Sequence, residues 1–291
     1  MGVLAGDWQS AAGPRSGGGY EEIELFGGQA ELFGVRHMPA PGPGAPGAAP
    51  TPVGVVVCSP TWTDADVNAE RELRLANRLA GAGIVVQRFS YRGVGASGGS
   101  PGSAGFGSLV HDVRAAVEHL ADRCGVERVG LVATRVGGLV AARVARDLPG
   151  TPVALWQPVL DPRQYLADAA AAAAADEPHV PVTQPGGAAH ALLGSRLGRD
   201  LFSPVVVGNL VDLLGTRPRP VLLVQLHRRV GLAPAYRDAV GRLDAQGFAV
   251  DVAYDPTEEE WWQVRPGREP SDDALAVTAQ WLGQQLAWPP A

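Results

Sequence analysis

A turn between an expected strand and an expected helix carries the side chain that most directly suggests chemistry. The segment Leu131-Val132-Ala133-Thr134-Arg135-Val136-Gly137-Gly138 places small residues on both sides of a large central one, Arg135. Small neighbours are needed where a backbone turns so sharply that the middle side chain is thrust over the edge of a sheet. A guanidinium stays protonated and cannot attack a carbonyl, but it can hold a carboxylate or phosphate. Arg135 is therefore a candidate anion-binding residue.

Two further stretches carry titratable side chains after expected strands. Residues 224–230 contain His227, and residues 255–262 contain a run of three glutamates centred on Glu259. A glutamate of this run could pair with Arg135 or with His227, and a bidentate arginine–carboxylate contact is geometrically specific. Three hypotheses stay open. Arg135 could form an internal ion pair that closes a pocket without function, or it could hold an anionic ligand. Alternatively, catalysis could be relocated to other groups, with His227 and Glu259 as acid and base.

Relocated catalysis has two further candidate nucleophiles. Cys58 ends an apolar run, and a thiol beside a base can act as a nucleophile. The alternative is that Cys58 is a small buried hydrophobic residue. Thr134 lies next to Arg135, but its side chain is expected to point elsewhere. Because Pro60 has no N–H, oxyanion donors would come from Thr61, Trp62 and Val136.

The remaining candidate ligand-binding residues fall at the carboxyl ends of expected strands, where ligands bind in open α/β sheets. Polar contacts are expected from Thr61, Trp62, Thr134 and Val136, and aromatic walls from Trp62, Trp156, Trp261 and Trp262. Aromatic walls beside one arginine suit a flat or acyl ligand that bears a carboxylate or phosphate. The alternative for Trp156 and one of the paired tryptophans is packing under a lid.

A second glycine-rich segment, residues 93–98, matches the Gly-x-Gly-x-x-Gly pattern of dinucleotide-binding motifs and follows an expected strand. Pyrophosphate binding also requires a helix that begins at once. Here Pro101 and several glycines delay any helix until about Ser108, which argues against a nucleotide site. The histidines outside these stretches show no metal-ligand spacing. We therefore expect neither a cofactor nor a metal.

The elements that must position these residues alternate between strand and helix. Short apolar runs typical of buried strands lie at 53–58, 84–86, 129–132, 153–156, 220–226 and 248–254. Helical spacing of apolar residues separates them, and a hairpin precedes them between residues 19 and 37. This alternation predicts an α/β fold with a mainly parallel sheet, helices on both faces and an N-terminal hairpin.

The rhythm breaks between residues 160 and 216, where an alanine run at 169–175 and a Pro/Gly segment occur. We interpret 160–216 as a lid inserted into a core formed by 20–159 and 217–291. Residues 1–19 are rich in Gly and Ser and are expected to form a flexible N-terminus.

The sequence resembles the α/β-hydrolase superfamily, in its serine aminopeptidase-like branch. The resemblance rests on the elbow around Arg135, on Arg92-Gly93-Val94-Gly95-Ala96-Ser97, and on Asp112-Val113-Arg114-Ala115-Ala116, and it covers residues 20 to 286. Within the superfamily the chain most resembles exosortase-associated hydrolase-like proteins, through 27–39, 60–72, 155–159 and 198–214. Members of that group resemble this chain in carrying arginine at the elbow.

The resemblance implies a degenerate catalytic triad. Active members carry Gly-x-Ser-x-Gly, whereas this chain has Ala133-Thr134-Arg135-Val136-Gly137. The stretches where the family places its acid and its histidine, 224–230 and 255–262, contain no carboxylate and no histidine respectively. The leading hypothesis is a pseudoenzyme that binds an anionic or acyl small molecule at Arg135 in a biosynthetic pathway. The alternatives are an acyl hydrolase, transferase or cyclase that uses His227 and a glutamate, and a structural accessory protein.

Composition limits the other function classes. The 291 residues carry a net charge of −6, which argues against binding to a phosphate backbone, and all 24 basic side chains are arginine, which excludes lysine Schiff-base chemistry. No apolar run approaches the ~20 residues of a membrane span. Two cysteines do not make a disulfide framework, so we expect free thiols in a cytoplasmic protein. The expected partners are a small-molecule ligand and either a second copy or a pathway protein, but no nucleic acid.

Overall fold

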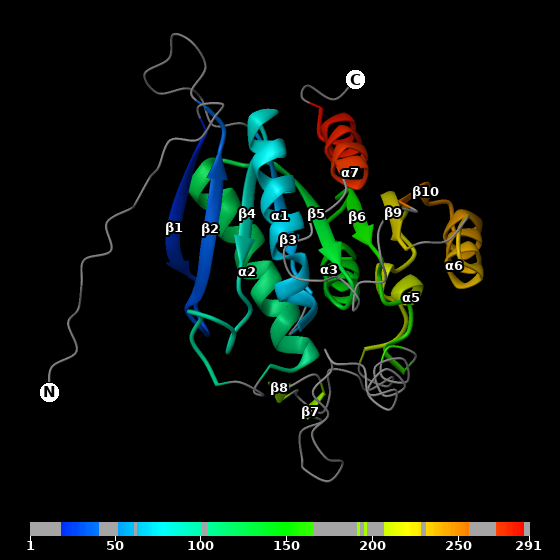
Figure 1. The fold of residues 1–291 in the computed structure, drawn as a ribbon, viewed down its shortest axis with the longest axis horizontal. Coiled ribbons are helices and arrows are strands. Elements are labelled where there is room, and N and C mark those ends of the chain that lie inside the picture. The colour runs from blue at the N-terminus through cyan, green and yellow to red at the C-terminus, as the bar shows by residue number, and fades with distance from the viewer. Residues whose placement is uncertain are drawn as a thin grey trace, which may run out of the picture.

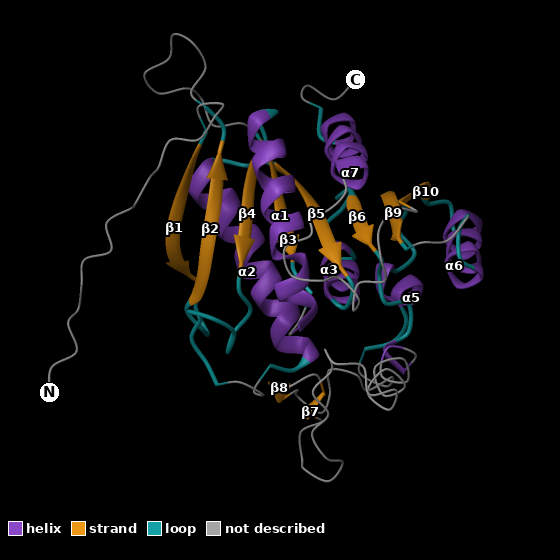
Figure 2. Cartoon of the chain, viewed as in Figure 1, coloured by secondary structure: helices purple, strands orange, loops and turns teal. Residues whose placement is uncertain are grey.

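An eight-stranded sheet forms the centre of the molecule, and helices cover both of its faces (Figures 1 and 2). The computed structural model describes residues 19–40, 52–60, 63–100, 104–163, 165, 191–192, 195–196, 207–227, 231–255 and 272–287. In spatial order the strands are β1 (Tyr20–Phe26), β2 (Leu32–Met38), β4 (Val85–Phe89), β3 (Val53–Cys58), β5 (Arg128–Thr134), β6 (Val153–Trp156), β9 (Pro220–Leu226) and β10 (Ala249–Asp255).

The pairing of the strands confirms the predicted mainly parallel sheet with an N-terminal hairpin. Strand β1 runs antiparallel to β2, and β2 runs antiparallel to β4. Every other neighbouring pair in the sheet, from β4 to β10, is parallel. Strands β3 and β6 are buried along their whole length, as expected of apolar runs covered on both faces.

Two hydrophobic layers enclose the sheet. One face is covered by α1 (Thr63–Gly81) and α7 (Asp272–Gln285), which bury Leu75, Leu79 and Leu282 against it. The other face is covered by α2 (Phe106–Cys124), α3 (Gly137–Ala145), α5 (Leu210–Leu214) and α6 (Pro234–Ala245). Because β5 is central, the turn at its carboxyl end is held between both layers.

Helix α3 follows that turn and is buried almost completely. All of its residues except Arg143 are buried, which is possible because most of them are small. Its carboxyl end is closed by Arg219, whose Nη1 donates to the carbonyl oxygens of Ala145 and, at 3.2 Å, Leu148. These bonds satisfy carbonyls that a helix end leaves without intrahelical partners, and so fix the helix that follows the elbow.

The two ends of the predicted insertion meet on the body of the protein. The Leu210 amide donates to the Leu160 carbonyl oxygen at 2.9 Å, and α5 buries Leu210 and Leu214 against α3. The two short strands β7 (Ala191–Leu192) and β8 (Ser195–Arg196) lie toward the end of the molecule where the parallel strands finish (Figure 1). The alanine run at 169–175 lies outside the described residues, as does nearly all of the N-terminal segment.

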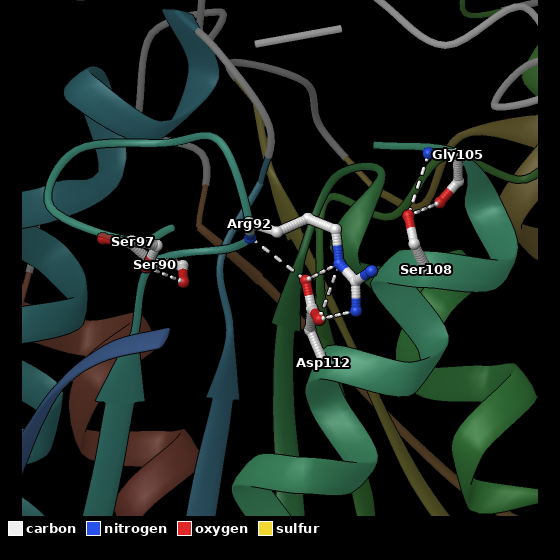
Figure 3. A network of polar contacts seen from close by, with 6 residues as sticks. All are labelled: Ser90, Arg92, Ser97, Gly105, Ser108 and Asp112. Carbon is white, nitrogen blue, oxygen red and sulfur yellow. Dashed lines mark hydrogen bonds and ion pairs between the residues drawn. The ribbon is translucent and has the colours of Figure 1, made fainter. Parts of the chain in front are cut away.

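The glycine-rich loop after β4 is closed on itself. The Gly93 amide donates to the Gly98 carbonyl oxygen at 2.9 Å, and the Gly98 amide donates to that of Glu31 at 2.7 Å. Helix α2 begins later, at Phe106, where the Ser108 hydroxyl accepts a bond from the Gly105 amide (2.9 Å, Figure 3). The helix therefore begins after the loop, close to the start predicted at about Ser108.

A buried ion pair anchors this loop to α2. The Asp112 carboxylate accepts bonds from Arg92 Nε at 2.9 Å and Nη2 at 2.6 Å, and from the Arg92 amide at 3.1 Å (Figure 3). The Asp112 side chain is 1% exposed. A bidentate contact of this kind is strong and geometrically specific, so the loop is held at one position above the sheet.

No helix in the described part of the chain is long and apolar enough to cross a membrane. Within the same residues, no cluster of three or more His, Cys, Asp or Glu side chains is arranged to hold a metal ion.

We predict that Arg92→Ala lowers the free energy of unfolding by about 3–5 kcal/mol, because it leaves the buried Asp112 carboxylate without its guanidinium. Arg242→Ala is the matched control: it breaks the ion pair with Asp212, whose partners are 52% and 60% exposed, and should cost less than about 1 kcal/mol. Urea denaturation measures both. Similar losses in the two variants would show that the buried pair does not anchor the loop.

Candidate functional site

The turn after β5 has the backbone geometry of a nucleophile elbow. Arg135 has a φ of 52°, in the left-handed region that residues with side chains rarely adopt. The Arg135 amide donates to the Trp156 carbonyl oxygen, and the Arg135 carbonyl oxygen accepts from the Gly138 amide, both at 3.0 Å. It also accepts from the Val159 amide at 3.2 Å. Neighbouring strands and α3 thus hold the arginine in this conformation.

The glycine after the elbow is required by close packing. A Cβ at Gly137 would lie 2.2 Å from the Cys58 carbonyl oxygen and 2.7 Å from that of Ser59. The backbone at the end of β3 therefore presses directly on the first turn of α3. This confirms the prediction that small residues flank a sharp turn, and it brings the loop after β3 beside Arg135.

The Arg135 guanidinium lies among carbonyl and aromatic groups. Its Nη1 donates to the Gln157 carbonyl oxygen at 3.2 Å, and its Cζ lies 5.5 Å from the centroid of the Tyr165 ring. The residue is 8% exposed. Burial raises the pKa of the Tyr236 phenol, and the nearby charge of Arg135 partly offsets this rise. The Tyr236 hydroxyl itself donates to the Pro158 carbonyl oxygen at 3.0 Å. The charged group is thus oriented in a largely water-excluded place.

Gln157 connects the elbow to the neighbouring strand β9. It has a φ of 42°, so it is also in the left-handed region. Its amide donates to the Val224 carbonyl oxygen at 2.7 Å, and its side-chain oxygen accepts from the Leu226 amide at 2.8 Å. Because the Gln157 carbonyl oxygen accepts from Arg135, these bonds fix the guanidinium relative to the end of β9.

A buried carboxyl lies under the elbow on the α1 face. Glu72, 2% exposed, accepts from the Ser59 hydroxyl at 2.7 Å and from the Thr134 hydroxyl at 3.5 Å. Burial raises the pKa of Glu72 to about 7, although the Ser59 hydrogen bond and the charges of Arg88 and Arg71 act to lower it. One side chain therefore joins the loop after β3 to the residue before Arg135.

Three of the sequence candidates are buried around the elbow. Thr134, 1% exposed, turns its hydroxyl toward Glu72, so it supports the elbow from below and does not line an opening. Trp156 is fully buried, and its Nε1 donates to the Thr278 hydroxyl of α7 at 2.9 Å. Trp156 thus packs in the core on the face covered by α1 and α7. Val136, 1% exposed, belongs to the core on the α3 face.

Two further candidates lie at the carboxyl ends of strands, and the rest lie outside the residues that the structure describes. His227 follows β9 and is partly exposed, and its amide donates to the Asp255 carbonyl oxygen at 3.3 Å. Cys58 is fully buried, and burial raises the pKa of its thiol well above the ordinary range. It therefore stays protonated and corresponds to the buried alternative, not to a nucleophile. The remaining candidates lie outside the described residues: Thr61, Trp62, Glu259, Trp261 and Trp262.

Sequence reasoning missed several residues that surround the guanidinium or support the elbow. Tyr165 and Tyr236 lie in segments with no motif, so nothing in the sequence pointed to them. Glu72 did carry a signal, since it shares a helical stripe with Leu75 and Leu79. An acidic residue on the apolar stripe of a helix is buried with it and must find polar partners.

Comparisons with known proteins agree with this architecture. Residues 67–185 match the serine aminopeptidase S33 family. An esterase from Pyrococcus furiosus is similar in structure, with a TM-score of 0.64 and 17% identity over 92% of each chain. Est1E from Butyrivibrio proteoclasticus gives a TM-score of 0.58 and 14% identity over 91% of this chain and 98% of its own. A serine hydrolase without lid from Xanthomonas campestris gives a TM-score of 0.52 and 19% identity, over 93% of this chain and 96% of its own. No curated protein matches the chain.

We predict that Gly137→Ala lowers the free energy of unfolding by about 1–3 kcal/mol, because the new methyl group overlaps the Cys58 carbonyl oxygen. Gly241→Ala is the matched control, since a Cβ there, within α6, meets nothing within 4 Å. It should raise stability by about 0.5–1 kcal/mol. Thermal or urea unfolding compares the two variants. If Gly137→Ala were as stable as the control, the close approach at the elbow would be refuted.

Proposed function

Because the chain has the α/β-hydrolase fold and carries arginine at its elbow, we propose that it binds an anionic or acyl small molecule at Arg135 without Ser–His–Asp chemistry. The single observation that carries the proposal is the left-handed backbone of Arg135, which puts a permanently charged group at the apex of the turn. A left-handed arginine is strained, and such strain persists only where the surrounding structure enforces it.

The fixed orientation of the guanidinium supports a binding role. Its contacts with the Gln157 carbonyl oxygen and the Tyr165 ring restrict its rotamers before any ligand arrives. Preorganisation of this kind reduces the entropy lost on binding. A planar fork of N–H donors in a water-excluded place matches a carboxylate or phosphate. The neighbouring rings of Tyr165 and Tyr236 suit an apolar or acyl portion of the same molecule.

The groups near the other expected triad positions support the absence of serine chemistry. Gln225, near the carboxyl end of β9, bonds to residues that follow the strand: its side-chain oxygen accepts from the Ala233 amide at 2.7 Å, and its Nε2 donates to the Gly231 carbonyl oxygen at 3.1 Å. Its amide is neutral, so it cannot replace an acid. We propose on this basis a pseudoenzyme with a degenerate triad.

The cellular role follows from the resemblance to exosortase-associated hydrolase-like proteins. We propose a place in a biosynthetic pathway in the cytoplasm, with residues 160–216 as a lid over the bound molecule. The closure of this segment by the bond from Leu210 to Leu160 supports its treatment as an insertion. Association with a second copy or with a pathway protein is part of the same proposal.

A second candidate function is acyl hydrolysis, transfer or cyclisation by His227 and a glutamate. The observation that favours it is the partly exposed position of His227 directly after β9. Loss of ester or thioester turnover in His227→Ala, with turnover kept in a surface variant, would select this function. A purely structural accessory role would be selected if Arg135→Gln left both ligand binding and pathway output intact.

We predict that octanoate binds the wild-type protein, that Arg135→Gln weakens its affinity by about tenfold or more, and that octanol discriminates little between the two. Removing a charged partner of a buried anion costs about 2–5 kcal/mol, which corresponds to an affinity loss of about thirtyfold or more. Isothermal titration calorimetry measures the affinities. Arg242→Gln, 52% exposed on α6, is the control and should bind octanoate as the wild type does. Equal octanoate binding by Arg135→Gln would overturn the proposed site.

We also predict that a fluorophosphonate probe, which reacts with activated serine nucleophiles, leaves the protein unlabelled. Intact-mass spectrometry after incubation at neutral pH detects any adduct. Labelling of one site per chain that a single Ser→Ala change abolishes would show serine chemistry and contradict the proposal.

A further inference from the structure

The two edges of the sheet differ in how they are protected against pairing with another chain. Strands β1 and β10 lie at opposite ends of the sheet, and no strand of the described residues pairs on the outer side of either (Figure 1). On β1, Glu22 and Glu24 turn inward to the buried Arg36. Inward-pointing charges of this kind make an edge a poor template for a further strand. Strand β1 is therefore a protected edge.

Strand β10 has no comparable protection. Its residues, 249–255, include no proline, glycine, lysine or arginine. Val252 and Tyr254 are 40% and 54% exposed, and both are residue types that are enriched in strands. The Asp251 carboxylate accepts from Trp281 Nε1 of α7 at 2.8 Å, so this charge is tied to a helix of its own chain. An edge of this composition is a ready template for a partner strand.

The backbone of β10 shows which residues would bind that partner. The His227 amide donates to the Asp255 carbonyl oxygen, so the backbone groups of Asp255 point toward β9. The direction of these groups alternates along a strand. The N–H and C=O groups of Val250, Val252 and Tyr254 consequently point away from β9, toward the outer side of the sheet. Each of these residues offers one donor and one acceptor there.

We propose that two copies of the chain pair through β10, antiparallel, about a two-fold axis that passes through Val252. This axis opposes Val252 to its own copy and Val250 to Tyr254, so each of these opposed pairs exchanges two backbone hydrogen bonds. The pair of Tyr254 and Val250 is also favourable, because aromatic and β-branched side chains stabilise each other across strands. The inference rests on that part of the proposed function which expects a partner, and it does not depend on anion binding at Arg135.

The charges of β10 favour this register over the neighbouring ones. An axis at Val252 places Asp251 opposite Ala253 and Asp255 opposite Ala249, so no two carboxylates face each other. An axis one residue earlier would oppose Asp251 to its own copy, and an axis one residue later would oppose Asp251 to Asp255. Like charges directly opposite each other destabilise a strand pair. Both alternatives would also pair fewer of the residues whose backbone groups point outward.

Helix α6, which covers this end of the sheet, is also complementary to its own copy. Arg242 of α6 pairs with Asp212 of α5 at 2.9 Å, and α5 lies toward the centre of the sheet, against α3. At about 100° per residue, the exposed Arg237 and Asp244 lie on the side of α6 opposite Arg242, which faces outward beyond β10. The two-fold axis reverses the direction of α6. It therefore brings Arg237 of one copy toward Asp244 of the other, at two symmetric positions.

The test is the association state of the full chain, measured by sedimentation equilibrium from low to high micromolar concentration. The wild type should reach twice the chain mass of 30.2 kDa. Val252→Arg should weaken dimerisation by about tenfold or more, because it opposes two guanidinium groups at the axis. Val252→Glu should weaken it similarly. An equal mixture of the two variants should restore the dimer, since each axis then pairs an arginine with a glutamate.

Ile23→Arg is the matched control, because Ile23 is 49% exposed on the protected edge β1. This variant should keep the wild-type dimer. Urea unfolding confirms that each variant is folded. Octanoate titration of the same samples reports on the site at Arg135 separately, so failure of the proposed binding site and failure of the proposed dimer are told apart.

A second measurement tests the register. The Cα atoms of a hydrogen-bonded antiparallel pair lie about 5.5 Å apart, which is within the range of a disulfide. Val252→Cys should therefore give a covalent dimer under mild oxidation. Tyr254→Cys should not, since it faces Val250 of the other copy. Cys58 and Cys124 are both buried and do not compete.

Several results would overturn the proposal. A wild type that stays monomeric at high micromolar concentration would do so, as would a dimer that Val252→Arg leaves intact. Dissociation by Ile23→Arg would place the interface on β1. Failure of the mixed Val252→Arg and Val252→Glu variants to associate, or cross-linking of Tyr254→Cys in place of Val252→Cys, would refute the axis at Val252.

Discussion

The structure depends on the contact between the first turn of α3 and the backbone at the end of β3. Gly137 has no Cβ, and the space it leaves is filled by the carbonyl oxygens of Cys58 and Ser59. This contact goes with a sharp turn of the chain two residues earlier, where Arg135 adopts its left-handed conformation. The fold therefore decides which residue stands at the apex, while the sequence decides what chemistry that residue can perform. Here it is a cation that cannot act as a nucleophile.

Polar groups on both sides of the elbow hold this turn in a defined arrangement. On one side, Gln157 and Tyr165 orient the guanidinium. On the other, Glu72 ties Ser59 to Thr134 beneath it. Buried polar groups are costly unless they are satisfied, so such a network restricts the elbow to few arrangements. A hydrolase fold keeps this architecture even when its nucleophile position holds another residue, because the packing does not depend on the hydroxyl.

Much of the fold could be predicted from the sequence, because its strands are short continuous apolar runs. The strands at Val53–Cys58, Val153–Trp156 and Pro220–Leu226 have the predicted bounds. The hairpin shows where pattern alone falls short. Its acidic residues Glu22 and Glu24 turn inward to pair with the buried Arg36, while Ile23 and Leu25 are 49% and 56% exposed. Alternation gives the period of a strand, but tertiary ion pairs decide which face is buried.

The site was predictable only in part, for a similar reason. Arg135 was identified because its neighbours obey a local steric rule, which a sequence displays. The direction of the Trp156 side chain depends on which face of β6 meets α7, and its bond to Thr278 spans 122 residues. Tyr165, Tyr236 and Gln157 likewise reach the elbow through long-range packing. Contacts of this kind join residues far apart in the chain and leave no local sequence pattern. They can therefore be identified only once the sheet and its helices are placed in three dimensions.

The most direct test of the central claim is a crystal structure of the protein with bound octanoate. The account predicts a carboxylate whose oxygens lie about 2.7–3.2 Å from the guanidinium nitrogens of Arg135, with the alkyl chain against the rings of Tyr165 or Tyr236. A carboxylate bound elsewhere, with Arg135 unchanged and occupied by its own protein partners, would contradict it.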